Sequence, residues 1–104
     1  SEEYARILSD DLINRKNYGI KRVKQELAFR GISREIIENT IDSLDNDAEN
    51  RIILVIKKKY LNKLNDEKGR KRAIDGLMRL GFSYSEIKSA LKQVSEFTEE
   101  EYYD

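Results

Sequence analysis

The sequence repeats itself at an offset of 50 residues, and this repeat limits the fold more than any other feature of the chain. Residues 20–44 align with residues 70–94 without a gap. The identical pairs are Lys21/Lys71, Arg22/Arg72, Leu27/Leu77, Gly31/Gly81, Ser33/Ser83 and Ile37/Ile87. A unit this short cannot bury its apolar side chains alone, so neighbouring units are expected to pack against each other.

Both copies of the repeat share a helix-ending glycine, one apolar residue, and a serine that begins the next helix. It reads Gly31-Ile32-Ser33 in the first copy and Gly81-Phe82-Ser83 in the second. Glycine adopts positive φ without steric cost, which suits the residue that follows a helix. The serine oxygen accepts a hydrogen bond from an exposed amide of the next helix. The pattern predicts a tight corner between two helices, similar to the turn of a helix-turn-helix motif.

Apolar spacings of three and four residues predict an all-α fold with six helices. The predicted helices are 2–16, 20–30, 34–44, about 47–64, 67–80 and a last helix from residue 84, and the fourth buries Ile53, Ile56, Tyr60 and Leu64. They form two tandem three-helix repeats, 1–46 and 47–95, in an elongated molecule. Residues 96–104 form an acidic tail, which is either a frayed end, the default for a terminus, or an arm that mimics a polyanion.

The composition argues against an enzyme. The 104 residues include no His and no Cys, so imidazole acid–base chemistry, thiol nucleophiles, disulfides and zinc fingers are excluded. The sequence has no glycine-rich phosphate loop and no nucleophile motif. We therefore expect no catalytic residue, no metal, no cofactor and no small-molecule substrate. No apolar run is long enough to span a membrane and no leader segment is visible, so we expect a cytoplasmic protein without a membrane partner.

Charge is segregated along the chain, although the 20 basic and 20 acidic residues balance overall. Residues 51–94 carry 12 basic and 4 acidic side chains, whereas residues 95–104 carry five acids and no base. Such asymmetry favours a surface that faces a polyanion or an acidic protein. The alternative is that these lysines only solvate helix surfaces.

Two groups of cations are the candidate binding residues. In the second repeat they are Lys57, Lys58, Lys59, Lys63, Lys68, Arg70, Lys71 and Arg72. In the first repeat they flank Tyr18 and Gly19, and they are Arg15, Lys16, Lys21, Arg22, Lys24 and Arg30. Cations in the first turn of a helix oppose its dipole, so Lys68, Arg70 and Lys71 are not placed for helix stability. Lysines and arginines beside an aromatic ring are typical of sites for single-stranded nucleic acid.

Both repeats resemble those of the bacterial RecX regulatory proteins. The first copy carries Tyr4-Ala5-Arg6, Tyr18-Gly19, Arg22, Glu26-Leu27, Gly31-Ile32-Ser33 and Ile36-Ile37, similar to the middle RecX repeat. The second carries Lys58, Lys71, Leu77, Leu80-Gly81-Phe82-Ser83-Tyr84 and Ile87, similar to the closing repeat. RecX proteins usually contain three such repeats, so the resemblance implies a C-terminal fragment with two of them.

The resemblance implies a regulator of the RecA recombinase that acts in recombination, DNA repair and the SOS response. Such proteins bind in the groove of the RecA–DNA filament and bridge its protomers, which limits filament growth, strand exchange and coprotease activity. The implied partners are the RecA filament and single- and double-stranded DNA. The alternatives are a stand-alone DNA-binding helical module without a RecA partner, and a helical repeat that binds an acidic protein; an enzyme fits least.

Overall fold

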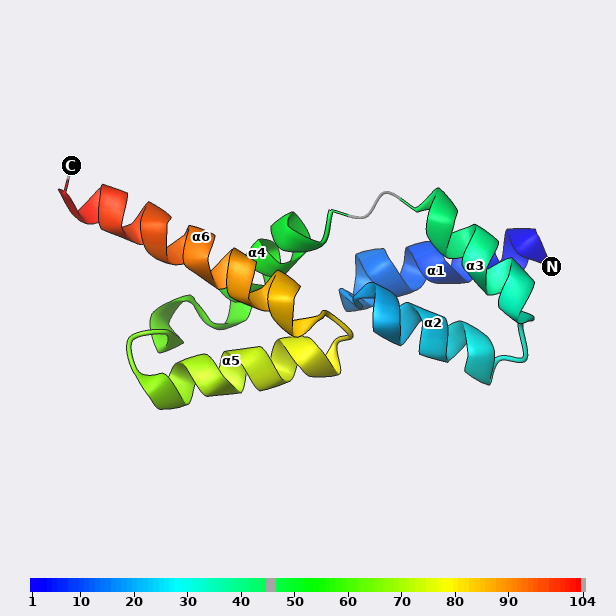
Figure 1. Cartoon of the computed structure of the whole chain (residues 1–104), viewed down its shortest axis with the longest axis horizontal. Coiled ribbons are helices and arrows are strands. Elements are labelled where there is room, and N and C mark those ends of the chain that lie inside the picture. The colour runs from blue at the N-terminus through cyan, green and yellow to red at the C-terminus, as the bar shows by residue number, and fades with distance from the viewer. Residues whose placement is uncertain (45–46, 104) are drawn as a thin grey trace.

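The computed structural model describes the backbone of residues 1–44 and 47–103 and the side chains of residues 1–44 and 47–95. Six α-helices and one 3-10 helix, and no strands, occur in this part of the chain (Figure 1). They are α1 (Glu2–Lys16), α2 (Ile20–Phe29), α3 (Arg34–Ser43), α4 (Ala48–Lys59), η1 (Leu61–Lys63), α5 (Glu67–Arg79) and α6 (Tyr84–Tyr103). The molecule measures 52 × 25 × 21 Å, which confirms the predicted elongated, all-helical fold.

The helices pack in two groups of three, which we name the first unit (α1–α3) and the second unit (α4–α6). Helix α1 packs against α2 and α3, which also pack on each other, and α6 packs against both α4 and α5. The two units lie end to end along the long axis of the molecule (Figure 1). This arrangement explains the large ratio of length to width.

The corner predicted from the repeat has the same backbone geometry in both units. Gly31 has φ 79° and Gly81 has φ 105°. The amide of the next residue donates to the carbonyl five residues back, from Ile32 to Leu27 at 3.1 Å and from Phe82 to Leu77 at 3.2 Å. Such 6→1 bonds satisfy a carbonyl at the end of a helix, so both corners are Schellman-type helix ends.

A serine begins the helix after each corner. Ser33 Oγ accepts from the amide of Ile36 at 3.3 Å, and Ser83 Oγ accepts from the amide of Glu86 at 3.2 Å. In the second unit the Ser83 amide also donates to Glu86 Oε1 at 2.9 Å, which completes a capping box. The predicted serine caps are confirmed, and the second is reinforced by a carboxylate that the first lacks.

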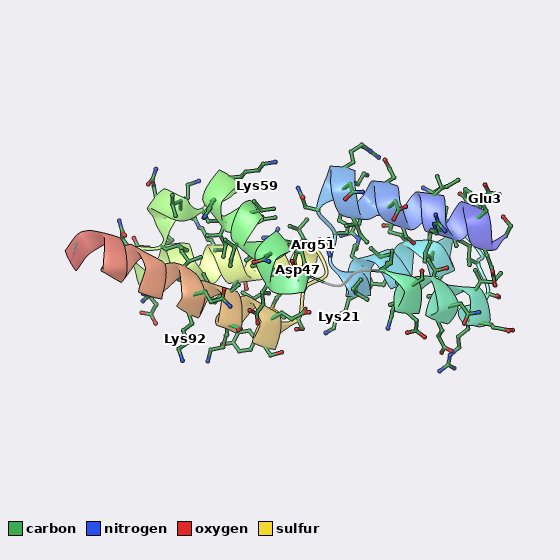
Figure 2. All side chains as sticks on the ribbon, turned by 90° about the horizontal axis from the view of Figure 1, so that it is seen from above. Glu3, Lys21, Asp47, Arg51, Lys59 and Lys92 are labelled. Atoms are coloured by element: carbon green, nitrogen blue, oxygen red, sulfur yellow. The ribbon has the colours of Figure 1, made fainter. Side chains whose placement is uncertain are left out.

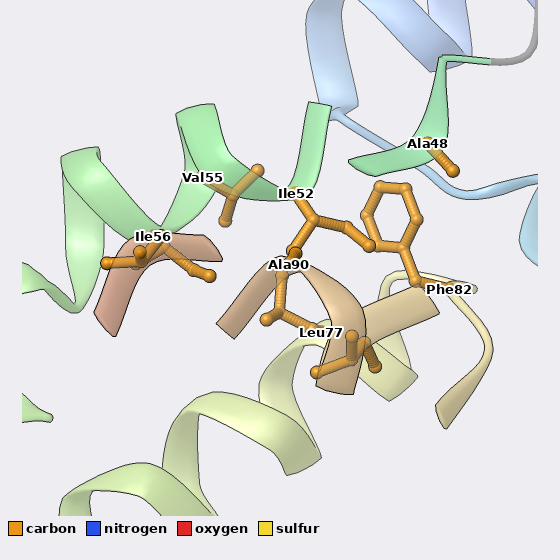
Figure 3. Close-up of a cluster of buried hydrophobic side chains, with 9 residues drawn as sticks. Ala48, Ile52, Val55, Ile56, Leu77, Phe82 and Ala90 are labelled. Carbon is orange, nitrogen blue, oxygen red and sulfur yellow. The ribbon is translucent and has the colours of Figure 1, made fainter. Parts of the chain in front are cut away.

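Each unit has its own hydrophobic core. The first core contains Ala5, Leu12, Val23, Leu27 and Ile37. The second is larger and contains Ala48, Ile52, Val55, Ile56, Leu77, Phe82, Ile87, Ala90 and Val94. Figure 3 shows the Phe82 ring reaching from the corner toward Ala48 and Ile52. The corner residue is therefore part of the core that joins α4 to α6.

The fourth helix is shorter than the sequence predicts. Helix α4 ends at Lys59, not near residue 64, because Tyr60 leaves the helical region at φ −127° and the chain then forms η1. The deeply buried side chains of α4 are Ile52, Val55 and Ile56, whereas Tyr60 is only half-buried. The predicted stripe lies on the core side, since Ile56 is buried and Ile53, Tyr60 and Leu64 are partly buried and pack against the same core. The prediction missed Ile52 and Val55, which lie deeper.

The last helix continues through most of the predicted acidic tail. Helix α6 extends to Tyr103, so the backbone from residue 96 to 103 is helical. The side chains of residues 96–104 lie outside the described part, and the interpretation of this segment as a polyanion mimic falls on them.

The two units meet through a loop of the first and the corner of the second. The amide of Gly19, between α1 and α2, donates to the Leu80 carbonyl at 2.7 Å, and the amide of Lys21 donates to the Gly81 carbonyl at 3.2 Å. A Cβ atom on Gly19 would lie 2.5 Å from the carbonyl carbon of Gly81. Two backbones this close leave no room for a side chain, so the contact requires glycine at position 19.

Candidate polyanion-binding surface

Three of the predicted cations line one surface hollow in the second unit. Lys63 comes from η1, and Lys68 and Arg72 lie one turn apart on α5. All three side chains are exposed, and no ion pair joins them to a carboxylate among the described residues. Lys68 lies in the first turn of α5, where a cation opposes the helix dipole. The hollow therefore gathers three cations against one carboxylate, that of Asp66, which also lines it.

Two other residues that line this hollow, Asp66 and Tyr60, have contacts with α5. Asp66 caps α5, because its Oδ1 accepts from the Gly69 amide at 2.6 Å. Tyr60 lies beside α5, and a Cβ atom on Gly76 would meet its hydroxyl oxygen at 2.3 Å. The Tyr60 ring is thus packed against the helix and is not free to stack on a base.

The remaining second-unit candidates lie at helix surfaces. Lys57, Lys58 and Lys59 occupy the last turn of α4, where positive charge favours the helix dipole. Lys71 pairs with Asp75 at 3.8 Å, while Arg70 is exposed. The run on α4 thus has a local structural reason, whereas Lys63, Lys68 and Arg72 form no ion pair with the described residues.

The first-unit candidates are mostly engaged within the chain. Arg15 Nε donates to Asp11 Oδ1 at 3.1 Å, and this hydrogen bond lowers the pKa of the Asp11 carboxyl and raises the pKa of Arg15. Arg30 Nη1 donates to the Tyr4 hydroxyl at 3.1 Å. The Lys16 ammonium lies 5.9 Å from the centre of the Tyr18 ring. These three cations therefore take part in contacts on the surface of the first unit.

Arg22 is part of the contact between the units. Its guanidinium lies 4.5 Å from the centre of the Tyr18 ring, and its Nη1 donates to the Arg79 carbonyl at 3.0 Å. It also pairs with Glu26 at 3.3 Å. Among the first-unit candidates only Lys21 and Lys24 are exposed cations for which the described residues offer no such partner. In the nucleic-acid site predicted around Tyr18, Arg22 therefore already contacts the second unit.

The structure also assigns a role to Arg51 that the sequence did not reveal. The half-buried guanidinium donates to the Tyr18 carbonyl and lies 5.3 Å from the centre of the Phe82 ring. Burial lowers the pKa of Arg51, and the charges of Glu86 and Asp47 partly offset this effect. Arg51 thus links the two units, and no local sequence pattern marks a contact with a residue 33 positions away.

The predicted cations do not gather on one face. Figure 2 shows Lys59 and Lys21 projecting on opposite sides of the long axis, with Arg51 and Asp47 near the contact between the units. Lys92 on α6 also projects away from Lys59. Cations therefore lie on more than one side of the molecule, and Lys63, Lys68 and Arg72 are the candidates that line a common surface hollow.

Neither a candidate metal site nor a candidate membrane span occurs among the described residues. In that part of the chain no three carboxylates are grouped so that they could hold a metal ion. None of its helices has the length and apolarity that crossing a membrane requires.

Comparison with known proteins gives one family. The family model "RecX, second three-helix domain" matches residues 2–41. "Regulatory protein RecX" of Streptococcus sanguinis is 33% identical over 73 residues, which is 69% of this chain and 28% of that protein. The protein of the same name from Clostridioides difficile is 30% identical to this chain over 90 residues, and that from Staphylococcus carnosus is 28% identical over 103 residues.

The match covers only part of these relatives. The chain spans 42% of the Clostridioides difficile protein and 39% of the Staphylococcus carnosus protein, although it is itself matched over 84% and 88% of its length. No solved structure matches the chain.

Proposed function

Since the chain belongs to the RecX family of regulatory proteins, we propose that it regulates the RecA recombinase. It binds in the groove of the RecA–DNA filament and limits strand exchange and coprotease activity. Its partners are then the filament and its DNA, and the regulation is non-enzymatic. The relatives carry the name of a regulatory protein, and the shared sequence extends over both units of this chain.

The hollow of Lys63, Lys68 and Arg72 is the observation that supports this proposal best. A filament on DNA presents phosphates, and cations that form no ion pair with the described residues gain more from binding phosphate than cations already paired. The three side chains come from two neighbouring elements, so they can contact one phosphate or two successive phosphates. A molecule 52 Å long and about 25 Å wide has a shape that fits along a groove.

The first experiment reverses the charge of the hollow. The variant Lys63→Glu/Lys68→Glu/Arg72→Glu is compared with Arg6→Glu/Lys88→Glu/Lys92→Glu, which changes the net charge equally on α1 and α6. Binding to RecA filaments on single-stranded DNA is measured by fluorescence anisotropy over a range of salt concentrations. We expect the hollow variant to lose about tenfold or more in affinity and about two in the slope of log affinity against log salt.

The control variant separates a local site from general electrostatic attraction. It should lose much less affinity and keep its salt slope, because its cations lie outside the hollow. Equal losses in the two variants would remove the hollow from the proposal. Circular dichroism of both variants checks the fold, which the substitution at Lys68 should favour because a glutamate in the first turn suits the dipole of α5.

The alternative function is a stand-alone DNA-binding module, and the same hollow supports it because phosphate recognition does not require RecA. A second measurement separates the two functions by comparing the affinity for RecA filaments with that for bare single-stranded DNA at matched ionic strength. Preference for the filament supports RecA regulation. Equal affinity supports the DNA-binding module, and negligible DNA affinity at moderate salt supports an acidic protein partner.

A further inference from the structure

The corner of the second unit receives a loop of the first unit through three carbonyl oxygens. The Gly19 amide donates to Leu80, the Lys21 amide donates to Gly81, and Arg22 Nη1 donates to Arg79. A Cβ atom on Gly81 would lie 2.5 Å from the Arg22 backbone nitrogen. The contact therefore depends on backbone groups of the corner and on the lack of a side chain at Gly81.

The corner of the first unit has the same backbone but nothing covers it. At the offset of 50 residues the three carbonyls belong to Phe29, Arg30 and Gly31, and no donor from the described residues reaches them. A Cβ atom on Gly31 would meet nothing within 4 Å. The Phe29 side chain is 87% exposed, the most exposed of the large hydrophobic residues in the described part. The three carbonyls and the exposed ring are therefore accessible to a partner that supplies backbone donors.

The direction of the existing contact indicates what would cover this corner. The loop comes from the unit that is earlier in the sequence, and the receiving corner belongs to the later unit. The model that matches residues 2–41 describes the second three-helix domain of its family, which implies a first. Arg30 Nη1 donates to the Tyr4 hydroxyl, so the start of α1 lies beside the open corner at the end of the molecule far from the second unit (Figure 1).

We propose that the corner from Phe29 to Ile32 is the docking surface for the α1–α2 loop of a preceding three-helix unit. The docking loop carries a glycine, whose amide donates to the Arg30 carbonyl as Gly19 donates to Leu80. The amide two residues later donates to the Gly31 carbonyl, as Lys21 donates to Gly81. Each unit thus gives a loop to the next unit and receives one from the unit before it.

The test adds such a unit to the full chain. A second copy of residues 1–46 is placed before Ser1, so that four residues separate the added α3 from α1, as residues 44–47 separate α3 from α4. The added copy alone carries ¹⁵N, introduced by segmental ligation, so that its Gly19 and Lys21 amides are observed separately. Hydrogen exchange of these two amides reports whether the added loop is docked.

The decisive comparison places Gly31→Asn either in the receiving corner or in the added copy. Asparagine tolerates positive φ, and the open space at Gly31 accepts its side chain, so the unit itself should stay folded. In the receiving corner the substitution should speed exchange of the added Gly19 and Lys21 amides by about tenfold or more, because the docked loop opens. In the added copy, whose corner has no neighbour, it should leave their exchange unchanged.

Two results would overturn the proposal. One is fast exchange of the added amides even when the receiving corner keeps Gly31, which would mean that the loop does not dock. The other is self-association of the 104-residue chain that Gly31→Asn abolishes, since the corner would then bind a second copy and not a preceding unit. Sedimentation velocity of the chain and of its Gly31→Asn variant measures the second result.

Discussion

In the second unit the corner at Gly81 is covered by the first unit, whereas the same corner at Gly31 is open to solvent. The backbone geometry is nearly identical, since φ is positive at both glycines and the same hydrogen bonds close both helix ends. The residue after the glycine differs more, because Phe82 is 2% exposed and Ile32 is only half-buried. The corner is therefore a local structure that forms in both units, but only in the second unit does it contact a neighbouring unit.

The largest expected difference between the units lies in the residue that follows each glycine. Phe82→Ala should lower the free energy of unfolding by about 3–5 kcal/mol, because a large side chain leaves the core around Ala48 and Ile52. Ile32→Ala should cost only about 1–2 kcal/mol, because its side chain already contacts solvent. Urea unfolding followed by circular dichroism measures both values. Equal losses in the two variants would show that Ile32 and Phe82 contribute equally to the free energy of unfolding.

The two glycines test the contact between the units. Gly31→Ala should cost about 1–2 kcal/mol, which is the strain of a side chain at positive φ. Gly81→Ala should cost about 1–2 kcal/mol more, because the new Cβ collides with the Arg22 backbone and breaks the hydrogen bonds from Gly19 and Lys21.

Hydrogen exchange identifies the source of this additional cost. The Gly19 and Lys21 amides should exchange faster in Gly81→Ala and keep their rates in Gly31→Ala. If both variants destabilise equally and neither changes these amides, the backbone contact between the units does not contribute to stability.

A smaller difference comes from the caps of α3 and α6. Ser33→Ala and Ser83→Ala should each cost about 1 kcal/mol, because each removes one hydrogen bond to an exposed amide. Glu86→Ala should lower the free energy of unfolding by about 0.5 kcal/mol, because it removes the hydrogen bond that the Ser83 amide donates to Glu86. The first unit has Ile36 at the equivalent position and no such bond. Thermal unfolding of the three variants measures these effects, and no loss in Glu86→Ala would contradict the capping box.

The sequence predicts the corners well because their chemistry is local. Glycine for positive φ and serine for a helix start act within five residues, and the structure confirms both at Gly31, Ser33, Gly81 and Ser83. The end of α4 could not be predicted in this way. Neither glycine nor proline comes directly after Lys59. The helix ends where Tyr60 packs beside Gly76 of α5, which is a tertiary contact.

In the candidate binding site, too, features set by the local sequence were predictable and features set by tertiary contacts were not. The sequence predicted Lys63, Lys68 and Arg72 as cations that bind a polyanion, but among fourteen candidates it could not select the three that share a hollow. The pairing of Arg15 with Asp11 four residues earlier was visible as a helical spacing. The use of Arg22 between the units was not, because the Arg79 carbonyl is 57 positions away.

The smallest expected effect is the acid sensitivity of the ion pair between Arg15 and Asp11 in the first unit. In the first unit the hydrogen bond from Arg15 holds the pKa of Asp11 below its ordinary value of 3.8. A carboxyl with a lowered pKa stabilises the fold above its unfolded pKa, and this stabilisation is lost as the pH falls through the folded pKa. The pair lies on the surface, so its effect on unfolding should be small and should decrease with added salt.

Carbon-13 NMR of the Asp11 carboxyl gives the direct measurement of this effect. The titration midpoint should lie below 3.8 in the native chain and return toward 3.8 in Arg15→Gln. The matched variant in the second unit is Lys71→Gln, whose pair with Asp75 is longer at 3.8 Å. It should leave the Asp11 midpoint unchanged, because Lys71 belongs to the other unit. A midpoint that Arg15→Gln does not move would show that Arg15 does not hold Asp11 in solution.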